Sequence, residues 1–303
     1  MIASSVIMIR PAAFGYNIET ATSNSFQQVS ELSSAKIQLA ALKEFEALVS
    51  KLTEHGIEVI LFNDTVTPVK PDAVFPNNWF STHADGKVFL YPMLSDLRRK
   101  ERREDILERL QTRFEVKQVI DFSLFERQQK YLEGTGSMVF DHAEKIVYAN
   151  LSARTHPDLL MAVAEELKYE VFTFKAADKN GNEIYHTNVL MNISDNLMVV
   201  CVDCVTHNKL PLLKRIQASK REKIFLSHYQ LERFAGNMLM LQNKTGKKFM
   251  VMSETAFRSL RKSEIATIEK SATILYSPLP TIETIGGGSA RCMLAENFLS
   301  PSL

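Results

Sequence analysis

Five stretches of the sequence share one pattern, and this repetition constrains the fold more than any other feature. Each begins with a polar or glycine-bearing turn and a short apolar run. In four of them a second polar turn and a second apolar run follow, which predicts a β-hairpin. Successive stretches start about 50 residues apart. The five stretches are residues 75–92, 133–150, 185–202, 234–253 and 286–298.

The fifth stretch has a single apolar run, so its hairpin needs a strand from elsewhere in the chain. The N-terminal run SVIMIRPA, residues 5–12, can supply that strand. The repeats would then form a closed circuit.

Between the hairpins, apolar residues recur at three- to four-residue spacing, which predicts a helix in each interval. A short β-rich run follows each helix. The unit of hairpin, helix and strand occurs five times, and we predict one α/β domain over residues 1–303, with helices outside and hairpin turns near a central axis. The helical patterns cover residues 26–54, 94–115, 156–170, 208–222 and 253–270.

Composition restricts the partners and the location. The net charge is +1, so no overall field attracts nucleic acid or an anionic membrane, and small or neutral partners fit better. The longest apolar runs fall short of the ~20 residues that span a bilayer. The N-terminus is typical of a first strand rather than an export signal, because no basic segment precedes its apolar run. The three cysteines form no disulfide framework, so we expect a cytoplasmic protein.

Polar residues at corresponding points of the repeats suggest thiol chemistry. A nucleophilic cysteine needs a partner that moves a proton, and a histidine oriented by a carboxylate can do this. The three glycines before Cys292 allow a substrate to approach the main chain closely. Taken singly, each residue also has an ordinary structural interpretation, such as a buried apolar cysteine, a core histidine or asparagines that cap a turn. The residues are Asp72, Asn77, Asn78, Glu133, His186, Asn188 and Cys292.

Six segments in order resemble the guanidine-modifying, or pentein, superfamily, which includes arginine deiminase, dimethylarginine dimethylaminohydrolase, amidinotransferases and succinylarginine dihydrolase. The resemblance implies a five-bladed α/β propeller of five ββαβ units around a pseudo-fivefold axis. The segments are PDAVFPNNWF (71–80), LRRKE (97–101), YLEGTGSMV (131–139), LSARTHPD (151–158), YHTNVLM (185–191) and GGGSARCM (286–293).

The resemblance implies that Cys292 is the nucleophile, that His186 is general acid and then base, and that Glu133 is its acidic partner. It also implies that Arg99 and Arg154 hold a substrate carboxylate, a task suited to the guanidinium fork. Arg98 competes with Arg99 for that role, and a solvated helix face is the alternative for both.

Two positions depart from the family pattern. Arginine deiminases and dimethylarginine hydrolases place an aspartate where this chain has Asn78, and many deiminases have one at Asn188. An amide both donates and accepts hydrogen bonds, so it suits a neutral ureido group better than a guanidinium cation. We therefore predict a cysteine hydrolase that converts citrulline into ornithine, ammonia and carbon dioxide through an S-carbamoyl-cysteine intermediate, most similar to the citrulline-utilisation hydrolases.

Several alternatives stay open at this point. An arginine deiminase, a succinylarginine-dihydrolase-like enzyme or an amidinotransferase would act on a guanidino substrate, and a non-catalytic pentein would be a binding scaffold. Cys201 and Cys204 have C-x-x-C spacing, but no second cysteine pair follows, so we predict no metal site. We expect no cofactor, no nucleic acid and no membrane. The expected partner is a small amino-acid substrate, and a homodimer is one option for the assembly.

Overall fold

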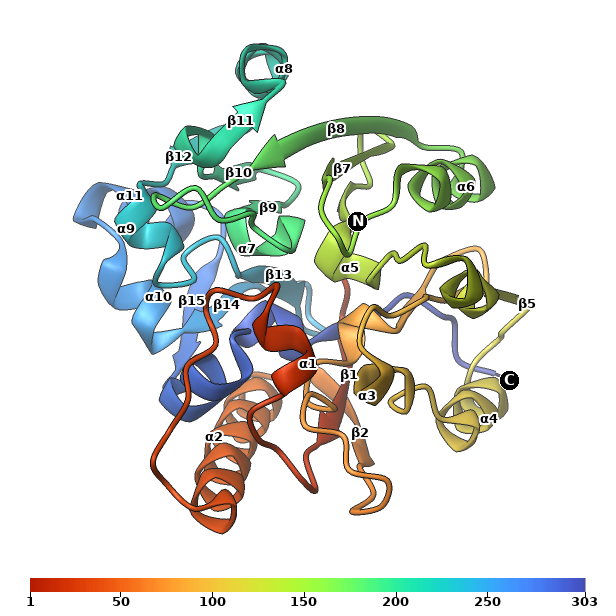
Figure 1. Cartoon of the computed structure of the whole chain (residues 1–303). Coiled ribbons are helices and arrows are strands. Elements are labelled where there is room, and N and C mark those ends of the chain that lie inside the picture. Colours follow the sequence, from red (N-terminus) through yellow and green to blue (C-terminus); the bar gives the residue numbers. More distant parts are fainter. Residues whose placement is uncertain (303) are drawn as a thin grey trace.

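The computed structural model describes residues 1–302, in which 16 strands form five small sheets. Figure 1 shows the sheets distributed around the middle of the molecule. In sheet order, the strands are β16 (Ala295–Asn297), β1 (Ser5–Arg10) and β2 (Glu58–Asn63); β3 (Phe80–Thr82), β4 (Lys87–Leu90) and β5 (Gln118–Asp121); β6 (Val139–Asp141), β7 (Ile146–Asn150), β8 (Glu170–Ala176) and β11 (Val205–His207); β9 (Met191–Ile193), β10 (Leu197–Val200) and β12 (Glu222–Phe225); and β13 (Leu239–Gln242), β14 (Lys248–Ser253) and β15 (Thr273–Ser277).

Each sheet repeats one connection pattern. Its first two strands pair antiparallel, and its second and third strands pair parallel. A parallel pair needs a crossover connection, which helices supply here. The crossover helices are α2 (Ser34–Glu54), α4 (Glu104–Arg113), α6 (Pro157–Leu167), α8 (Lys209–Ala218), and α10 (Glu254–Ser259) with α11 (Lys262–Glu269).

These helices lie on the rim of the molecule, in chain order around it (Figure 1). The mixed α/β class and the five hairpin-helix-strand units are confirmed by the strand pairing. The closed five-bladed propeller stays a prediction.

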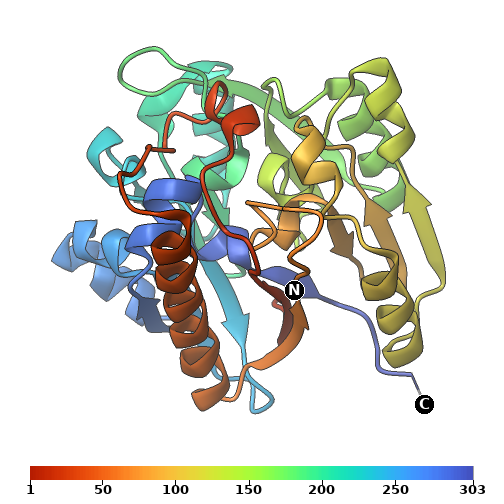
Figure 2. The ribbon, with the colours of Figure 1, turned by 60° about the horizontal axis from the view of Figure 1, so that its bottom comes forward.

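The two ends of the described chain meet in one sheet. Strand β16 pairs antiparallel with β1, with Ile7 opposite Ala295, so the N-terminal run completes the fifth hairpin as predicted. Beyond β16 the chain extends along α4, where Pro301 forms a bridge with Phe114 (Figure 2).

Four predicted helices have different bounds in the structure. The pattern at 208–222 forms a helix only over Lys209–Ala218, and Glu222 already belongs to β12. The pattern at 26–54 forms a helix only from Ser34, because Ser33 is extended and takes the N-cap position. The pattern at 94–115 is broken into α3 (Asp96–Arg99) and α4. The pattern at 253–270 is broken at Leu260 and Arg261, which are extended.

The third predicted helix is confirmed, and its ends have clear causes. Pro157 fills the first turn of α6 and Asp158 follows it, where a missing N–H and a negative charge are both tolerated. Lys168 ends the helix in a left-handed conformation with a φ of 60°. Within residues 1–302, no helix is both long enough and apolar enough to cross a membrane.

Candidate active site

The candidate residues come from equivalent places in the fold. In four units a single helical turn precedes the first strand of the sheet. These turns are η1 (Pro76–Asn78), α5 (Gly134–Ser137), α7 (Thr187–Leu190) and η5 (Ala290–Met293). They contact one another, since α5 touches η1 and α7, and η1 touches η5.

Each of these turns carries a predicted site residue. Asn78 ends η1, Glu133 lies directly before α5, His186 lies directly before α7, and Cys292 lies in η5. The fold therefore brings together side chains that are up to 214 positions apart, from Asn78 to Cys292 (292 − 78).

A small cavity lies where these turns meet. Its lining is strongly polar, although the side chains that form it are buried. Charged groups of both signs face it, together with the thiol and the imidazole. The lining includes Cys292, His186, Asn78, Asp72, Arg98 and Arg154.

The His186 ring is held by a buried carboxylate. Its Nε2 lies 2.9 Å from Oε2 of Glu133, and the other oxygen of Glu133 accepts the backbone N–H of Leu94 at 3.1 Å. Burial alone would raise the pKa of Glu133, but Arg154 and the hydrogen bond with His186 hold it well below its usual range. Burial lowers the pKa of His186 to about 4, against the opposing effect of Glu133. The imidazole is therefore neutral near pH 7, as a general base requires.

Gly136 allows the turns to approach the ring this closely. A Cβ at this position would lie 2.4 Å from Nδ2 of Asn78 and 2.6 Å from Nδ1 of His186. No larger residue fits without moving one of the two site residues.

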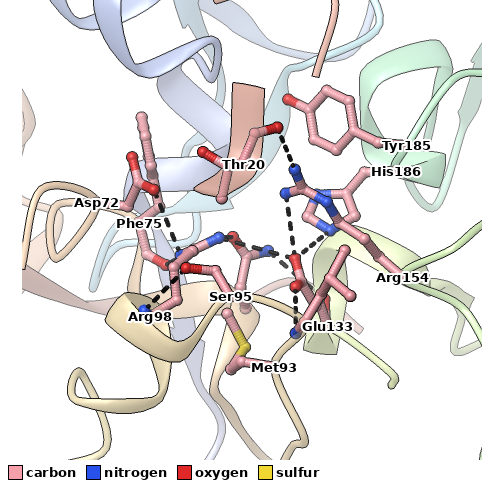
Figure 3. A network of polar contacts seen from close by, with 12 residues as sticks. Thr20, Asp72, Phe75, Met93, Ser95, Arg98, Glu133, Arg154, Tyr185 and His186 are labelled. Carbon is pink, nitrogen blue, oxygen red and sulfur yellow. Dashed lines mark hydrogen bonds and ion pairs between the residues drawn. The ribbon is translucent and has the colours of Figure 1, made fainter. Parts of the chain in front are cut away.

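Arg98 forms the centre of a second polar cluster (Figure 3). Its guanidinium donates to Oδ1 of Asn78 at 2.8 Å and to both carboxylate oxygens of Glu101, at 2.9 and 3.0 Å. Asp72 lies 3.8 Å away. One oxygen of Asp72 accepts Nδ2 of Asn17 at 2.7 Å, whereas Oδ1 is buried without a hydrogen-bond partner within residues 1–302. Burial raises the pKa of Asp72.

Arg154 lies on the opposite side of Glu133, with its guanidinium 4.7 Å from the centre of the Tyr185 ring. It contacts Oε2 of Glu133 at 3.4 Å (Figure 3). It also donates to the carbonyl of Thr20 at 3.1 Å and to Oγ of Ser23 at 2.7 Å. Both residues belong to the segment between β1 and α2, which contains the short helix α1 (Ile18–Ala21) near the middle of the molecule (Figure 1).

The Cys292 sulfur faces two side-chain amides. Nδ2 of Asn237 lies 3.3 Å from Sγ and Nδ2 of Asn188 lies 3.9 Å from it. Burial raises the pKa of the thiol, so the thiol form prevails in the resting site.

Three predicted substrate-binding residues do not line the cavity, namely Arg99, Asn77 and Asn188. Arg99 points away from it and donates to the carbonyls of Met93 and Leu94, at 2.9 and 3.2 Å. Its neighbour Arg98 is the arginine that reaches the cavity. Asn77 donates to Oγ1 of Thr135 at 3.1 Å.

Asn188 has a different position from Asn78. It reaches the Cys292 sulfur but lines a separate cavity, together with Arg291.

Some site residues were missed from the sequence. Asn237 occupies the place in the fourth repeat, FAGNMLM, that corresponds to the other site turns, so the repeat contained a usable signal. Thr20, Ser23 and Asn24 lie in a polar segment without periodicity, and no sequence signal marks them.

The CVDC segment holds a disulfide between Cys201 and Cys204, a bridge that the sequence did not predict. Cys292 is the free cysteine of the described chain. In residues 1–302, no group of three or more His, Cys, Asp or Glu side chains is arranged to hold a metal ion.

Comparison with protein families identifies one match. The model of the family described as N,N dimethylarginine dimethylhydrolase, eukaryotic, matches residues 10–299. No curated protein matches the sequence.

Solved structures share the fold at low sequence identity. The N-terminal domain of ArgZ, an arginine dihydrolase from the ornithine-ammonia cycle in cyanobacteria, was solved with bound substrate. It has a TM-score of 0.75 and 16% identity, over 96% of this chain and 97% of that domain. A complex of AgrE with L-arginine has a TM-score of 0.74 and 18% identity, over 98% of this chain but 40% of AgrE. DDAH from Pseudomonas aeruginosa, in complex with citrulline, has a TM-score of 0.68 and 14% identity, over 98% of this chain and 100% of that chain.

Proposed function

Because the chain belongs to the eukaryotic N,N-dimethylarginine dimethylhydrolase family, whose members hydrolyse C–N bonds, we propose that it is a cysteine hydrolase of free amino acids and that citrulline is its substrate. The observation that carries this proposal is that Cys292 and His186 line one cavity, that Glu133 holds the His186 ring from behind, and that neutral amides lie beside the thiol. We propose that the whole chain forms one catalytic domain, with its five units arranged as propeller blades.

In the first half of the reaction, His186 takes the proton of the Cys292 thiol, and the thiolate attacks the ureido carbon. A C–S bond forms, and the electron pair of the C=O bond moves to the oxygen. When this tetrahedral intermediate collapses, the bond between the carbon and the side-chain nitrogen breaks. His186 returns its proton to that nitrogen, which leaves as the amine of ornithine, and Cys292 carries a carbamoyl group.

In the second half, His186 accepts a proton from water, and the water oxygen attacks the carbamoyl carbon. The C–S bond breaks, its electron pair returns to sulfur, and carbamic acid is released, which decomposes to ammonia and carbon dioxide. Glu133 keeps the imidazole in one orientation through both halves.

The preference for a ureido group is supported by the polarity of the cavity. Oδ1 of Asn78 is engaged by Arg98, whereas its Nδ2 has only a long contact of 3.5 Å with the carbonyl of Glu133. An N–H donor at this position suits the ureido oxygen, because a guanidinium group has no acceptor to offer it. Oδ1 of Asp72 can accept an N–H of the terminal amide.

Arg98 and Arg154 are the side chains we propose for the substrate carboxylate. Both guanidinium groups line the cavity and already make hydrogen bonds that hold their planes in place. Orientation of the guanidinium before binding reduces the entropy lost when the carboxylate binds.

A second candidate is the hydrolysis of arginine, favoured by the unpaired oxygen of Asp72. The ArgZ domain, an arginine dihydrolase, supports the same alternative through its fold. The choice between the two substrates depends on whether the Asp72 carboxylate or the Asn78 amide dominates recognition.

Substrate assays decide between the candidates. The purified protein is incubated separately with citrulline and with arginine, and ornithine, citrulline and ammonia are measured. We expect equal amounts of ornithine and ammonia from citrulline, no turnover of arginine, and no product with Cys292→Ser. Asn78→Asp should lose citrulline activity, because a carboxylate repels the ureido oxygen. Formation of citrulline from arginine, with citrulline itself inert, would contradict the proposal.

A further inference from the structure

Asn237 lies at the one site turn that is not helical. It belongs to the loop between α9 (His228–Leu231) and β13, directly before the first strand of the fourth unit. Its side chain is fully buried. None of the roles described above for the reaction uses it.

Two backbone groups of opposite polarity determine how its amide is oriented. The N–H of Arg291 donates to Oδ1 of Asn237 at 3.1 Å, and Nδ2 donates to the carbonyl of Asn188 at 3.0 Å. A flipped amide would place a donor against a donor and an acceptor against an acceptor. The oxygen therefore faces Arg291, and the nitrogen faces Asn188.

The second hydrogen of Nδ2 is then left for the nucleophile, whose thiol can in turn donate to Oδ1 of Asn237 at 3.6 Å. Nδ2 lies 3.3 Å from the Cys292 sulfur, closer than Nδ2 of Asn188 at 3.9 Å. Within residues 1–302, these two amides are the side-chain hydrogen-bond partners of the sulfur. The neighbouring guanidinium of Arg291 is engaged elsewhere, by the carbonyl of Leu294 at 2.7 Å and by Glu296 at 2.9 Å.

The loop that carries Asn237 is packed tightly against the turn after His186. A Cβ on Gly236 would lie 2.4 Å from the carbonyl oxygen of Val189. On the other side, Nδ2 of Asn192 donates to the carbonyl of Met238 at 2.7 Å. The amide is thus held in place before any substrate binds.

We propose that Asn237 is a further catalytic residue, whose side-chain N–H stabilises the thiolate of Cys292 by a charge-assisted hydrogen bond. This inference rests on the proposed function in that Cys292 is the nucleophile. A donor aimed at sulfur lowers the free energy of the thiolate more than that of the thiol, because the hydrogen bond to a charged acceptor is stronger.

The test measures how readily the Cys292 thiol is alkylated at different pH values. Cys292 is alkylated with iodoacetamide between pH 6 and pH 10, and the modified peptide is quantified by mass spectrometry. Asn237→Leu removes the donor at similar volume. We expect the pKa of alkylation to rise by about one unit and the rate at neutral pH to fall about tenfold. Asn237→Asp keeps the acceptor for Arg291 and replaces only the donor, so we expect the same direction and a larger shift.

Asn192→Ala serves as the matched control, because it removes a polar contact of the same loop while the bonds of Asn237 to Arg291 and Asn188 still orient the amide. We expect its alkylation profile to follow that of the wild type. Thermal unfolding shows which variants are folded. If Asn237→Leu does not fold, the alkylation profile of Asn237→Asp decides the test. A wild-type alkylation profile in a folded Asn237 variant would overturn the proposal.

The two proposals fail separately in these experiments. A shifted alkylation profile, in a protein that hydrolyses neither citrulline nor arginine, would support the role of Asn237 and reject the proposed substrate. Citrulline hydrolysis by the wild type, with unshifted alkylation in the variants, would support the function and reject the role of Asn237.

Discussion

His186 and Cys292 form a neutral pair in the resting site, because burial acts on both in the direction that disfavours charge. It lowers the pKa of the imidazole to about 4 and raises that of the thiol. Nε2 of His186 faces the Glu133 carboxylate at 2.9 Å, so this nitrogen carries the proton of the neutral ring. Nδ1 is left as the basic nitrogen.

The role of Glu133 in selecting this tautomer can be tested with Glu133→Gln. The glutamine can turn its NH₂ group to Nε2, which would move the ring proton to Nδ1 and remove the base. We expect kcat for citrulline to fall by about 10²- to 10⁴-fold, the range of general acid–base contributions. Steady-state kinetics measures this, with circular dichroism to confirm the fold.

Glu126→Gln is the control for this change. Glu126 pairs with Arg102 at 2.6 Å and does not line the cavity. We expect it to keep a kcat near that of the wild type. An equal loss in both variants would mean that Glu133 acts only through overall stability.

At the scale of elements, the turn before each first strand has two tasks. It starts the hairpin, and it carries a polar side chain toward the centre. Where two such turns touch, space is so limited that glycine is required, as at Gly236, which lies against the main chain of Val189 and Leu190. The close packing of these turns is what holds the site residues in register.

Gly236→Ala tests this packing. Its Cβ would lie 2.4 Å from a carbonyl oxygen, so the loop must shift, and we expect the free energy of unfolding to fall by about 1–3 kcal/mol. Alkylation of Cys292 should slow at the same time, because the loop also carries Asn237. Gly15→Ala is the control, since no heavy atom lies within 4 Å of a Cβ there. Equal stability of the two variants would contradict the packing argument.

The hairpin of β3 and β4 contains a buried histidine outside the active site. Nε2 of His83 lies 2.8 Å from Oγ of Ser81, and burial lowers its pKa from 6.5 to about 3. Between pH 3 and pH 6.5, His83 therefore binds a proton in the unfolded chain but not in the folded chain. The contribution of the buried, neutral His83 to the free energy of unfolding is complete above pH 6.5 and is lost progressively as the pH falls toward 3.

We predict that His83→Gln makes stability less dependent on pH. Between pH 6.5 and pH 4, the slope of the free energy of unfolding should decrease by up to about 1.4 kcal/mol per pH unit. Urea denaturation at several pH values measures this slope. Between pH 7 and pH 9, the free energy of unfolding of His83→Gln and of the wild type should depend on pH in the same way. A slope below pH 6 that is the same in both proteins would show that His83 does not cause the pH dependence.

At the scale of the whole molecule, the first and last strands hold the two ends together. β16 pairs with β1, and Cys292 lies only three residues before β16. The position of the nucleophile therefore depends on a strand pair that joins residues about 290 positions apart, such as Ser5 and Asn297.

Truncation tests this dependence. Removal of residues 295–303 deletes β16 and leaves β1 without its antiparallel partner. We expect this variant to lose cooperative urea unfolding and citrulline hydrolysis. Removal of residues 301–303 keeps β16 and should preserve both, at some cost from the lost bridge between Pro301 and Phe114. Cooperative unfolding of the longer deletion would contradict the role of the closing strand.

The sequence by itself determined the features that depend on local periodicity. The five hairpins, the helix in each interval and the closing role of the N-terminal strand were predicted from apolar spacing, because strand and helix periods are properties of short segments. Glu133, His186 and Cys292 were predicted as a group because they lie at corresponding turns of the repeats and in segments that resemble the pentein family, and the structure brings them to one centre.

Only the tertiary structure decided which side chains face the cavity. Arg98 and Arg99 are neighbours on one helical turn, and consecutive helical residues point about 100° apart, so the sequence could not show that Arg98 is the one directed inward. Asn237 and the segment containing Thr20 reach the site through contacts with distant parts of the chain. Packing across the molecule selects these directions. The repeat pattern marks the turn that carries Asn237, but no local pattern in the sequence shows which way its side chain, or that of Arg98, is directed.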